Sequence, residues 1–422
     1  MNPLNVNIEK YNLKNGLEVI LLNDDRIPLV GVNLWYNVGS ANEERDKTGF
    51  AHLFEHIMFQ GSMNVPKEMH FKYIQEAGGN LNGSTSTDRT NYYETVPANF
   101  LEMILWLESD RMGFLLPAID QEKLNNQIDV VRNERLQRYD NVPYGLSFEK
   151  LFSSLYPDTH PYHSPVIGWM EDIMKMELDD VKKFFTGYYN PSNATIVVGG
   201  KHDSYKTKEL IEKYFGEIPS NGRTKLVIEA PELFDLTESK KVIHYDKIQL
   251  PRLYIAWPTV KAFSKNEASL EILAELLGGS KNARIYKKLV VEEQIAQQVS
   301  VFQHSGKYGG TFIIIATSKP GISLEKLKAE IFHQINDVIQ NGIEQKELTR
   351  IKNGIKSSFI YSMQNLDNVL DRLNEYNFYL GEPDSFEYDL NRFKNVSAED
   401  VKNAASYLQN NFVELHVMPN DK

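Results

Sequence analysis

The chain of 422 residues contains no cysteine. Disulfide bonds, thiolate zinc sites and cysteine nucleophiles are therefore all excluded. Any metal site in this protein must be built from His, Asp or Glu side chains.

Long apolar runs are also missing. No segment approaches the roughly 20 apolar residues that a membrane-spanning helix requires, so no membrane span is expected. The opening residues, MNPLNVNIEKYNLKNG, have neither the basic nor the apolar segment of a signal peptide. This favours a cytoplasmic protein, or a periplasmic one if a signal peptide has been removed.

Positive charge is the minority charge. Lys and Arg number 46 against 57 Asp and Glu, which gives a net charge of −11 at pH 7. Because a phosphate backbone would repel such a chain, nucleic acid is not an expected partner.

The remaining composition is that of a multidomain protein, with 41% hydrophobic residues. Strand patterns occupy 15–40, 78–97 and 193–200, and helical periodicity occupies 47–60, 66–77, 97–113, about 120–139 and the stretch SYKTKELIEKYFGEIP. After a polar, Pro- and Gly-containing stretch, the second half repeats this order of strands and helices. It includes a helix at 323–341 and a closing strand, FVELHVMP.

The pattern predicts an α+β fold with two similar α/β-sandwich domains of about 200 residues each. The predicted boundaries are 1–222 for the first domain, 223–238 for a linker and 239–422 for the second domain.

One segment, KTGFAHLFEHIMFQGSMNVP, places His52, Glu55 and His56 among large apolar residues. Residues four apart lie on one face of a helix, so both imidazoles could reach a single zinc ion. Glu55 lies on the same side, where it could accept a proton from a zinc-activated water. Two histidines at this spacing also occur on ordinary surface helices, so H-x-x-E-H alone is only a hypothesis.

Catalytic zinc normally keeps three protein ligands, so a third must come from elsewhere. The helix at 120–139 has Leu124, Ile128, Val131 and Leu136 on its predicted apolar side, and Glu134 lies beside that side. Periodicity alone leaves six candidates open: Glu76, Asp88, Glu94, Glu108, Asp110 and Glu134.

Three blocks in order, GFAHLFEHIMFQGS, GGNLNGSTSTDRTNYYETVP and VVRNERLQRYDNVPYG, resemble the signature blocks of the M16 (pitrilysin-type, inverzincin) zinc peptidases. That family includes the mitochondrial processing peptidase and insulin-degrading enzyme. The resemblance continues through HPYHSPVIGWMEDI and YYNPSNATIVVGG, and it implies a half-clamshell of two homologous domains. The chain is most similar to the zinc-bearing subunit of the two-chain, processing-peptidase-like branch.

Carried over residue by residue, the resemblance implies that His52, His56 and Glu134 hold one Zn²⁺ per chain and that Glu55 is the general base. Many members carry another glutamate two helical turns before the ligand glutamate, where this chain has Gln127. That difference removes no ligand, although it affects the groups that orient the ligands.

The block NLNGSTST matches the edge strand on which family members pair an extended peptide. The resemblance therefore implies substrate binding at Asn82, Gly83 and Ser84 through main-chain hydrogen bonds. Most relatives have Ala at the position of Gly83. The alternative is that these are ordinary strand residues.

In the family, the half opposite the zinc commonly supplies an arginine and a tyrosine seven residues apart. Aligned on Leu289, this chain has Val290 and Gln297 at those positions. We therefore expect a heterodimer with a related zinc-free chain that supplies the pair. A homodimer that uses other groups is the alternative.

Together these features predict a zinc metalloendopeptidase that hydrolyses short or unfolded peptides inside a closed chamber. The alternative is a non-catalytic assembly or scaffold subunit of the same fold, which would be expected to have lost the metal motif. The intact set of His52, Glu55, His56 and Glu134 favours the enzyme.

Overall fold

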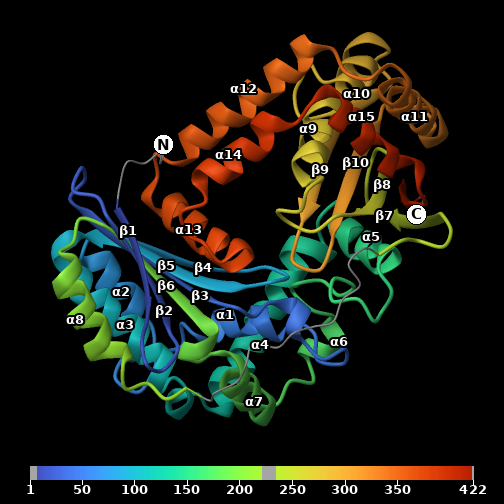
Figure 1. The fold of residues 1–422 in the computed structure, drawn as a ribbon. Coiled ribbons are helices and arrows are strands. Elements are labelled where there is room, and N and C mark those ends of the chain that lie inside the picture. The colour runs from blue at the N-terminus through green and yellow to red at the C-terminus, as the bar shows by residue number, and fades with distance from the viewer. Residues whose placement is uncertain (1–6, 221–233, 421–422) are drawn as a thin grey trace. The chain divides into compact units, whose positions relative to one another are not determined.

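The structure is a computed structural model that describes residues 7–220 and 234–420. These residues form two units, each with its own sheet (Figure 1). Unit 1 contains residues 7–135, 164–220 and 360–387, and unit 2 contains 136–163, 234–359 and 388–420.

Unit 1 is built on a six-stranded sheet with the order β1-β2-β6-β3-β5-β4. Every residue of β6 is buried, as is all of β3 except its first residue, because helices cover both faces of the sheet. β4 is an edge strand, and within the described residues it pairs only with β5. The strands are β1 (Asn7–Asn12), β2 (Glu18–Asn23), β3 (Leu29–Tyr36), β4 (Asn80–Thr85), β5 (Thr90–Pro97) and β6 (Ala194–Gly200).

Helices lie on both faces of this sheet (Figure 1). On one face α1 contacts β4 and β5, and α3 contacts β3 and β5. On the other face α13 contacts β3, β5 and β6, and the Trp35 and Phe378 rings meet there with centroids 5.9 Å apart. The helices are α1 (Phe50–Ile57), α2 (Met69–Glu76), α3 (Leu101–Phe114), α4 (Gln121–Arg135), α6 (Met170–Ile173), α7 (Leu178–Tyr188), α8 (Ser204–Phe215) and α13 (Leu366–Leu380).

Unit 2 is built on a five-stranded sheet with the order β7-β11-β8-β10-β9. α9 contacts β9, α11 contacts β8 and β10, and α5 contacts β8 and β11. The strands are β7 (Lys240–Asp246), β8 (Arg252–Thr259), β9 (Ala296–Ser305), β10 (Gly310–Ser318) and β11 (Val413–Pro419). The helices are α5 (Ser147–Leu155), α9 (Glu267–Leu277), α10 (Arg284–Tyr286), α11 (Leu324–Asn341) and α15 (Ala398–Ala405), with π-helical turns η4 (Leu136–Asp140) and η6 (Lys287–Glu292).

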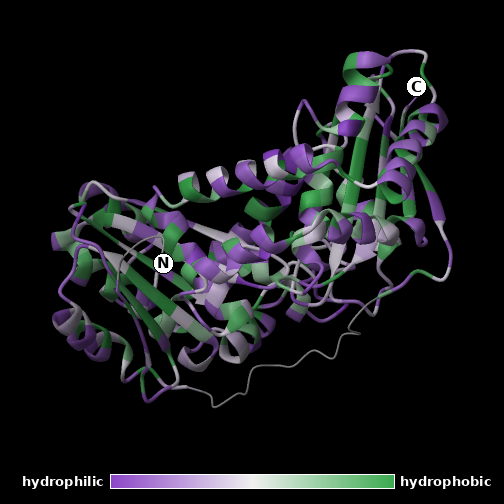
Figure 2. Cartoon of the chain, turned by 45° about the horizontal axis from the view of Figure 1, so that its top comes forward, coloured by the Kyte–Doolittle hydropathy of each residue, from purple (hydrophilic) through white to green (hydrophobic). Residues whose placement is uncertain are grey.

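Two helices, α12 (Gln345–Ser362) and α14 (Phe386–Asn395), begin in one unit and end in the other. Single-turn 3₁₀ helices are η1 (Ser40–Asn42), η2 (Ala98–Phe100), η3 (Leu116–Ala118), η5 (Pro191–Asn193) and η7 (Ser406–Gln409). Hydrophobic residues concentrate on the strands, whereas the helices carry hydrophilic residues on part of their surface (Figure 2). This distribution is typical of sheets that are covered on both faces.

Strand topology confirms the predicted repeat. In unit 1, β6 runs parallel to β2 and antiparallel to β3, which is followed by β5 and β4. In unit 2, β11 runs parallel to β7 and antiparallel to β8, which is followed by β10 and β9. The order β2-β6-β3-β5-β4 therefore matches β7-β11-β8-β10-β9 strand for strand.

The predicted domains, 1–222 and 239–422, are each continuous in sequence. The two units are not, because each contains segments from both halves of the chain. α5 belongs to the first half of the chain but packs in unit 2, and α13 belongs to the second half but packs in unit 1. Each sheet has a second apolar face to cover, and a helix from the other half of the chain covers it. The predicted linker, 223–238, falls mostly on residues 221–233, which lie outside the described residues.

The predicted helices near the motif are present but shorter, as α1, α2, α3 and α4. Leu124, Ile128 and Val131 of α4 are buried as predicted. The prediction was wrong for Leu136, which is 37% exposed because α4 ends at Arg135 and a π-helical turn follows.

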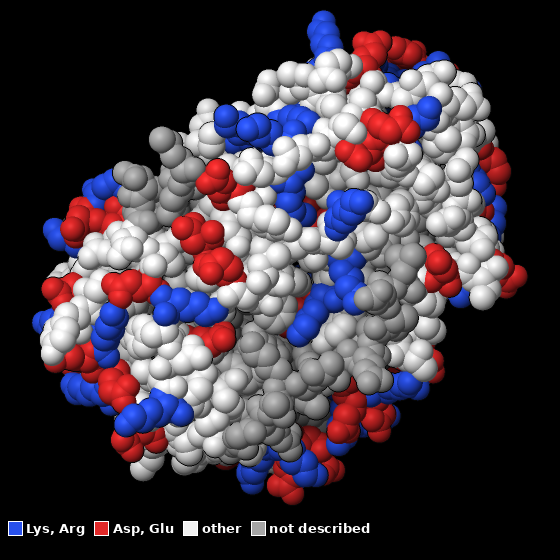
Figure 3. All heavy atoms as spheres, in the orientation of Figure 1, with Lys and Arg blue, Asp and Glu red and all other residues white. Residues whose placement is uncertain are grey.

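Among the described residues, no helix combines the length and the apolar composition needed to cross a membrane. On the face seen in Figure 3, acidic and basic side chains are interspersed with uncharged ones.

Candidate metal centre

The H-x-x-E-H segment forms α1, a helix of eight residues. Leu53, Phe54 and Ile57 are buried and fix the helix against the sheet, whereas the two histidines and Glu55 remain partly exposed. The mixture of apolar and ionisable residues therefore reflects two functions of one short helix, in which one side packs and the other presents the polar groups.

A carboxylate from an earlier loop caps the start of α1. Glu43 accepts hydrogen bonds from the backbone N–H groups of Gly49 (2.8 Å) and Ala51 (2.7 Å). The N-terminus of a helix has such unpaired N–H donors. A carboxylate there accepts their hydrogen bonds and interacts favourably with the positive end of the helix dipole.

The structure brings His52, His56 and Glu134 together. The two imidazole rings are 4.9 Å apart, and Glu134 Oε2 lies 3.7 Å from His52 Nε2 and 3.2 Å from His56 Nε2. Ligands at about 2.0–2.1 Å from a tetrahedral zinc are separated from one another by about 3.3 Å. Two nitrogens and one carboxylate oxygen at these distances therefore fit zinc.

These three side chains are 13–23% exposed. Catalytic zinc sites need an accessible position for water and substrate, in addition to three protein ligands. The partial exposure of the cluster is consistent with a catalytic site and differs from that of a closed structural site.

Glu55 is held in place by Thr85, the last residue of β4. The Thr85 hydroxyl donates a 2.6 Å hydrogen bond to Glu55 Oε2. Burial raises the pKa of Glu55 above its ordinary value, and the Thr85 hydrogen bond and His56 lower it in part. A partly buried carboxylate with a raised pKa is suited to accept a proton near neutral pH.

The edge strand β4 passes beside this carboxylate. A Cβ added to Gly83 would lie 3.1 Å from Glu55 Cγ and 3.3 Å from the rings of Phe59 and Tyr92. Side chains alternate along a strand, so Gly83 and Thr85 face α1. Ser84 turns away and its hydroxyl is within 2.7 Å of Asn91 Oδ1, while Asn82 is exposed and accepts from the Gly83 N–H.

Of the six predicted candidates for the third ligand, only Glu134 joins the two histidines. Glu76 is exposed and pairs with Lys72, while Asp88 accepts from the Tyr379 hydroxyl. Asp110, on α3, accepts hydrogen bonds from the side chains of Ser62 and Asn64 and so anchors the loop that follows α1.

The remaining two candidates, Glu94 and Glu108, form a second cluster with His70. Their carboxylate oxygens lie 3.6 and 3.9 Å from His70 Nε2, and all three side chains are at most 5% exposed. The Arg111 guanidinium pairs with Glu108 and stacks 4.1 Å from the centre of the Tyr92 ring. The Arg111 cation therefore already balances the charge of Glu108, while burial raises the pKa of Glu94 well above its ordinary value, and the full burial of the cluster gives substrate no access.

Gln127 is buried in α4, about two turns before Glu134, and donates to Asn126 Oδ1. In unit 2, Val290 is half-buried in η6 and Gln297 is exposed on β9. Neither side chain carries the positive charge or the phenol that the family commonly has at these positions.

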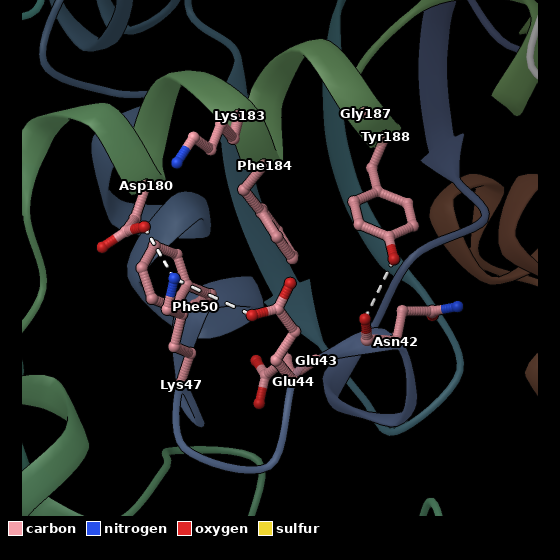
Figure 4. A pocket seen from close by; sticks show the side chains of 10 residues that line it. All are labelled: Asn42, Glu43, Glu44, Lys47, Phe50, Asp180, Lys183, Phe184, Gly187 and Tyr188. Atoms are coloured by element: carbon pink, nitrogen blue, oxygen red, sulfur yellow. Dashed lines mark hydrogen bonds and ion pairs between the residues drawn. The ribbon is translucent and has the colours of Figure 1, made fainter.

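A cavity of about 290 Å³ lies beside the start of α1 (Figure 4). Phe50 of α1 and Phe184 of α7 line its apolar side. At its rim Lys47 lies 2.8 Å from Asp180 and 3.8 Å from Glu44, and the Tyr188 hydroxyl donates to the Asn42 carbonyl. The Lys47 ammonium is therefore already paired.

Sequence reasoning missed two residues beside the centre, Glu43 and Thr85. Thr85 could have been found from its spacing, because it lies two residues after Gly83 on the same face of a strand. Glu43 could not, because nothing in a loop glutamate indicates which helix it caps.

Comparisons with known proteins agree with this geometry. Residues 18–166 match the family model described as Insulinase (Peptidase family M16), and residues 175–355 match the one described as Peptidase M16 inactive domain. The chain is 31% identical over 373 residues to zinc protease PqqE of Helicobacter pylori, covering 87% of this chain and 83% of that protein. It is 22% identical to a probable mitochondrial-processing peptidase subunit beta of Arabidopsis thaliana, covering 85% and 68%.

Solved structures of other proteins share the fold. A protease from Helicobacter pylori superposes with a TM-score of 0.91 at 27% identity, covering 98% of this chain and 100% of that one. A chain of complex III from Candida albicans superposes with a TM-score of 0.82 at 16% identity, covering 97% and 96%.

Proposed function

This chain belongs to peptidase family M16, and we propose that it is a zinc-dependent endopeptidase that hydrolyses short or unfolded peptides in a closed chamber. The single observation that carries the proposal is the convergence of His52 Nε2, His56 Nε2 and Glu134 Oε2, with the Glu55 carboxylate beside them. A metallopeptidase function also agrees with the relatives, which are named zinc proteases.

In this proposal His52, His56 and Glu134 hold the ion, one per chain. Zinc, when bound, supplies Lewis-acid activation of water near neutral pH. Glu55 accepts a proton from the attacking water and later delivers it to the leaving amine. Thr85 holds one oxygen of Glu55 through its 2.6 Å hydrogen bond, so the proton is accepted and released at a fixed place.

β4 would hold the substrate. Its edge is available for main-chain pairing among the described residues, and Gly83 lies directly beside Glu55. A peptide added there as a further strand would pass the carboxylate with little demand on its own sequence. Asn82, Gly83 and Ser84 are accordingly proposed as the substrate-binding residues, with Asn82 and Gly83 contributing through the backbone.

We propose a heterodimer with a related zinc-free chain. The support is that Val290 and Gln297 replace the arginine and tyrosine expected in the half opposite the zinc. A relative is named as a subunit of a processing peptidase, and a structural neighbour belongs to a multisubunit complex. A homodimer remains the alternative arrangement.

The test is cleavage of a short quenched-fluorescent peptide by the purified chain, with added zinc and with a chelator. Chelator-sensitive turnover supports the peptidase and argues against a strict need for a partner. A zinc-loaded chain that cleaves only after a zinc-free companion is added supports the heterodimer. A chain that binds no zinc at all contradicts the proposal.

The second candidate is a non-catalytic assembly subunit. Its support is the fold shared with a chain of complex III, although that likeness concerns the fold alone. Stoichiometric zinc in the purified protein would argue against this candidate.

A further inference from the structure

Residues 165–172 are separated in sequence from α1 and α4, but they contact the start of α1 and the end of α4. Gly49, the residue before α1, has φ +90°, and Gly168 has φ +83°. A Cβ on Gly168 would lie 2.5 Å from Gly49 Cα, and one on Gly49 would lie 2.6 Å from the Ile167 carbonyl oxygen. The two backbones therefore touch, and only glycine combines these φ values with this approach.

Thr48 ties the same segment to α1 through its side chain. Its hydroxyl donates to Asp172 Oδ2 (2.7 Å) and accepts from the Trp169 N–H (2.9 Å), and its own N–H donates to Asp172 Oδ2 (3.3 Å). Thr48 is 2% exposed. Three hydrogen bonds at a buried residue fix the chain two residues before α1 begins.

The connection to α4 runs through Arg135, the neighbour of Glu134. Arg135 Nη1 donates a 2.9 Å hydrogen bond to the Gly168 carbonyl, and Arg135 is 5% exposed. Gly168 thus touches the start of α1 with its Cα and the end of α4 with its carbonyl oxygen.

We propose that Thr48, Gly168 and Arg135 are positioning residues for the metal centre. They set the distance between α1, which carries His52 and His56, and the last turn of α4, which carries Glu134. The inference rests on the proposed zinc site, and it adds that zinc affinity depends on the 165–172 segment. The physical reason is that donor atoms from two helices must lie within a few tenths of an ångström of the zinc geometry before the ion binds.

The decisive experiment measures the zinc dissociation constant of the metal-free full chain by competition with a chromophoric chelator. Thr48→Val keeps the shape of the side chain but removes its hydroxyl, and we expect about tenfold weaker zinc binding, at the low end for residues around a metal site. Thr48→Ser keeps the hydroxyl and should restore the affinity to within about twofold, by the same scale.

Matched variants separate positioning from general damage. Gly168→Ala should weaken zinc binding, whereas Gly381→Ala should not, because Gly381 has a similar φ of +76° with nothing within 4 Å of the added Cβ. Arg135→Gln should weaken binding, whereas Arg132→Gln, at an exposed pair with Asp129, should not. The melting temperature of each metal-free variant is recorded beside the affinity.

The outcomes are distinguishable. If the wild type binds no zinc, the proposed function fails. If the wild type binds zinc and Thr48→Val binds it equally well, the positioning role is overturned while the proposed function stands. If Gly168→Ala does not fold, Thr48→Val still decides. An affinity that falls equally in the Gly381 and Arg132 controls also overturns the inference.

Discussion

Thr85→Val tests the proposed general base through the residue that holds it. Valine has almost the shape of threonine, so the packing of β4 against α1 is kept while the 2.6 Å hydrogen bond to Glu55 is lost. That hydrogen bond fixes the direction in which the Glu55 carboxylate meets the attacking water. A displacement of a reacting group by about 1 Å can cost about 10²-fold in rate, and because Glu55 remains on α1 its displacement should be smaller, so we expect a decrease of about tenfold in kcat.

The sign of the pH effect follows from the same contact. The carboxylate is the active form of Glu55, so activity falls as the pH drops through its pKa. Burial raises this pKa and the Thr85 hydrogen bond lowers it in part. Removing that hydrogen bond raises the pKa further, so the acid limb of the kcat profile should move to higher pH in Thr85→Val.

The assay is peptide cleavage across pH with zinc content measured on each sample. Thr85→Ser serves as the control, because it retains a hydroxyl and should restore both the rate and the acid limb. A Thr85→Val protein with full zinc and a kcat within twofold of the wild type would refute the reasoning.

Four further changes give independent outcomes. Glu55→Gln should retain zinc and lower turnover by at least about 10²-fold, since only the proton acceptor is lost; unchanged cleavage would exclude Glu55 as the base. Glu134→Gln should lower zinc occupancy in metal analysis, and full occupancy would show that the third ligand lies elsewhere. Gly83→Ala should reduce kcat by a few-fold, because the added Cβ lies 3.1 Å from Glu55 Cγ and must displace it slightly; an increase in kcat would contradict this. Arg111→Leu leaves Glu108 buried without its cation and should lower the free energy of unfolding by about 3–5 kcal/mol in denaturant titration, whereas retained stability would show that the second cluster is neutralised otherwise.

Much of the local structure could be predicted because it depends on short-range patterns. The helices around the motif, the strand pair that contains β4 and β5, and the repeat of element order all follow from periodicity, and the observed elements agree. Leu136 was wrongly predicted to be buried because a regular helix was extended past Arg135, where the backbone changes to a π-helical turn.

The candidate site was only partly accessible from pattern. The spacing of His52, Glu55 and His56 predicts one helix face, and the structure places them on α1. Six acidic residues remained open as the third ligand, and resemblance to M16 peptidases rather than periodicity favoured Glu134. The roles of His52, His56 and Glu134 as ligands and of Glu55 as base stay predictions, as do the substrate contacts of β4.

The sequence by itself determined which residues can do chemistry, because residue type and spacing along one helix are local properties. It excluded thiolate sites through the absence of cysteine, and it placed the two imidazoles and Glu55 on one side of α1. The tertiary structure alone decided which carboxylate meets them, that Thr85 holds Glu55, and that Gly168 touches both Gly49 and Arg135. These contacts join residues 30 to 119 positions apart, so they depend on how helices and strands pack, and packing is a property of the whole unit.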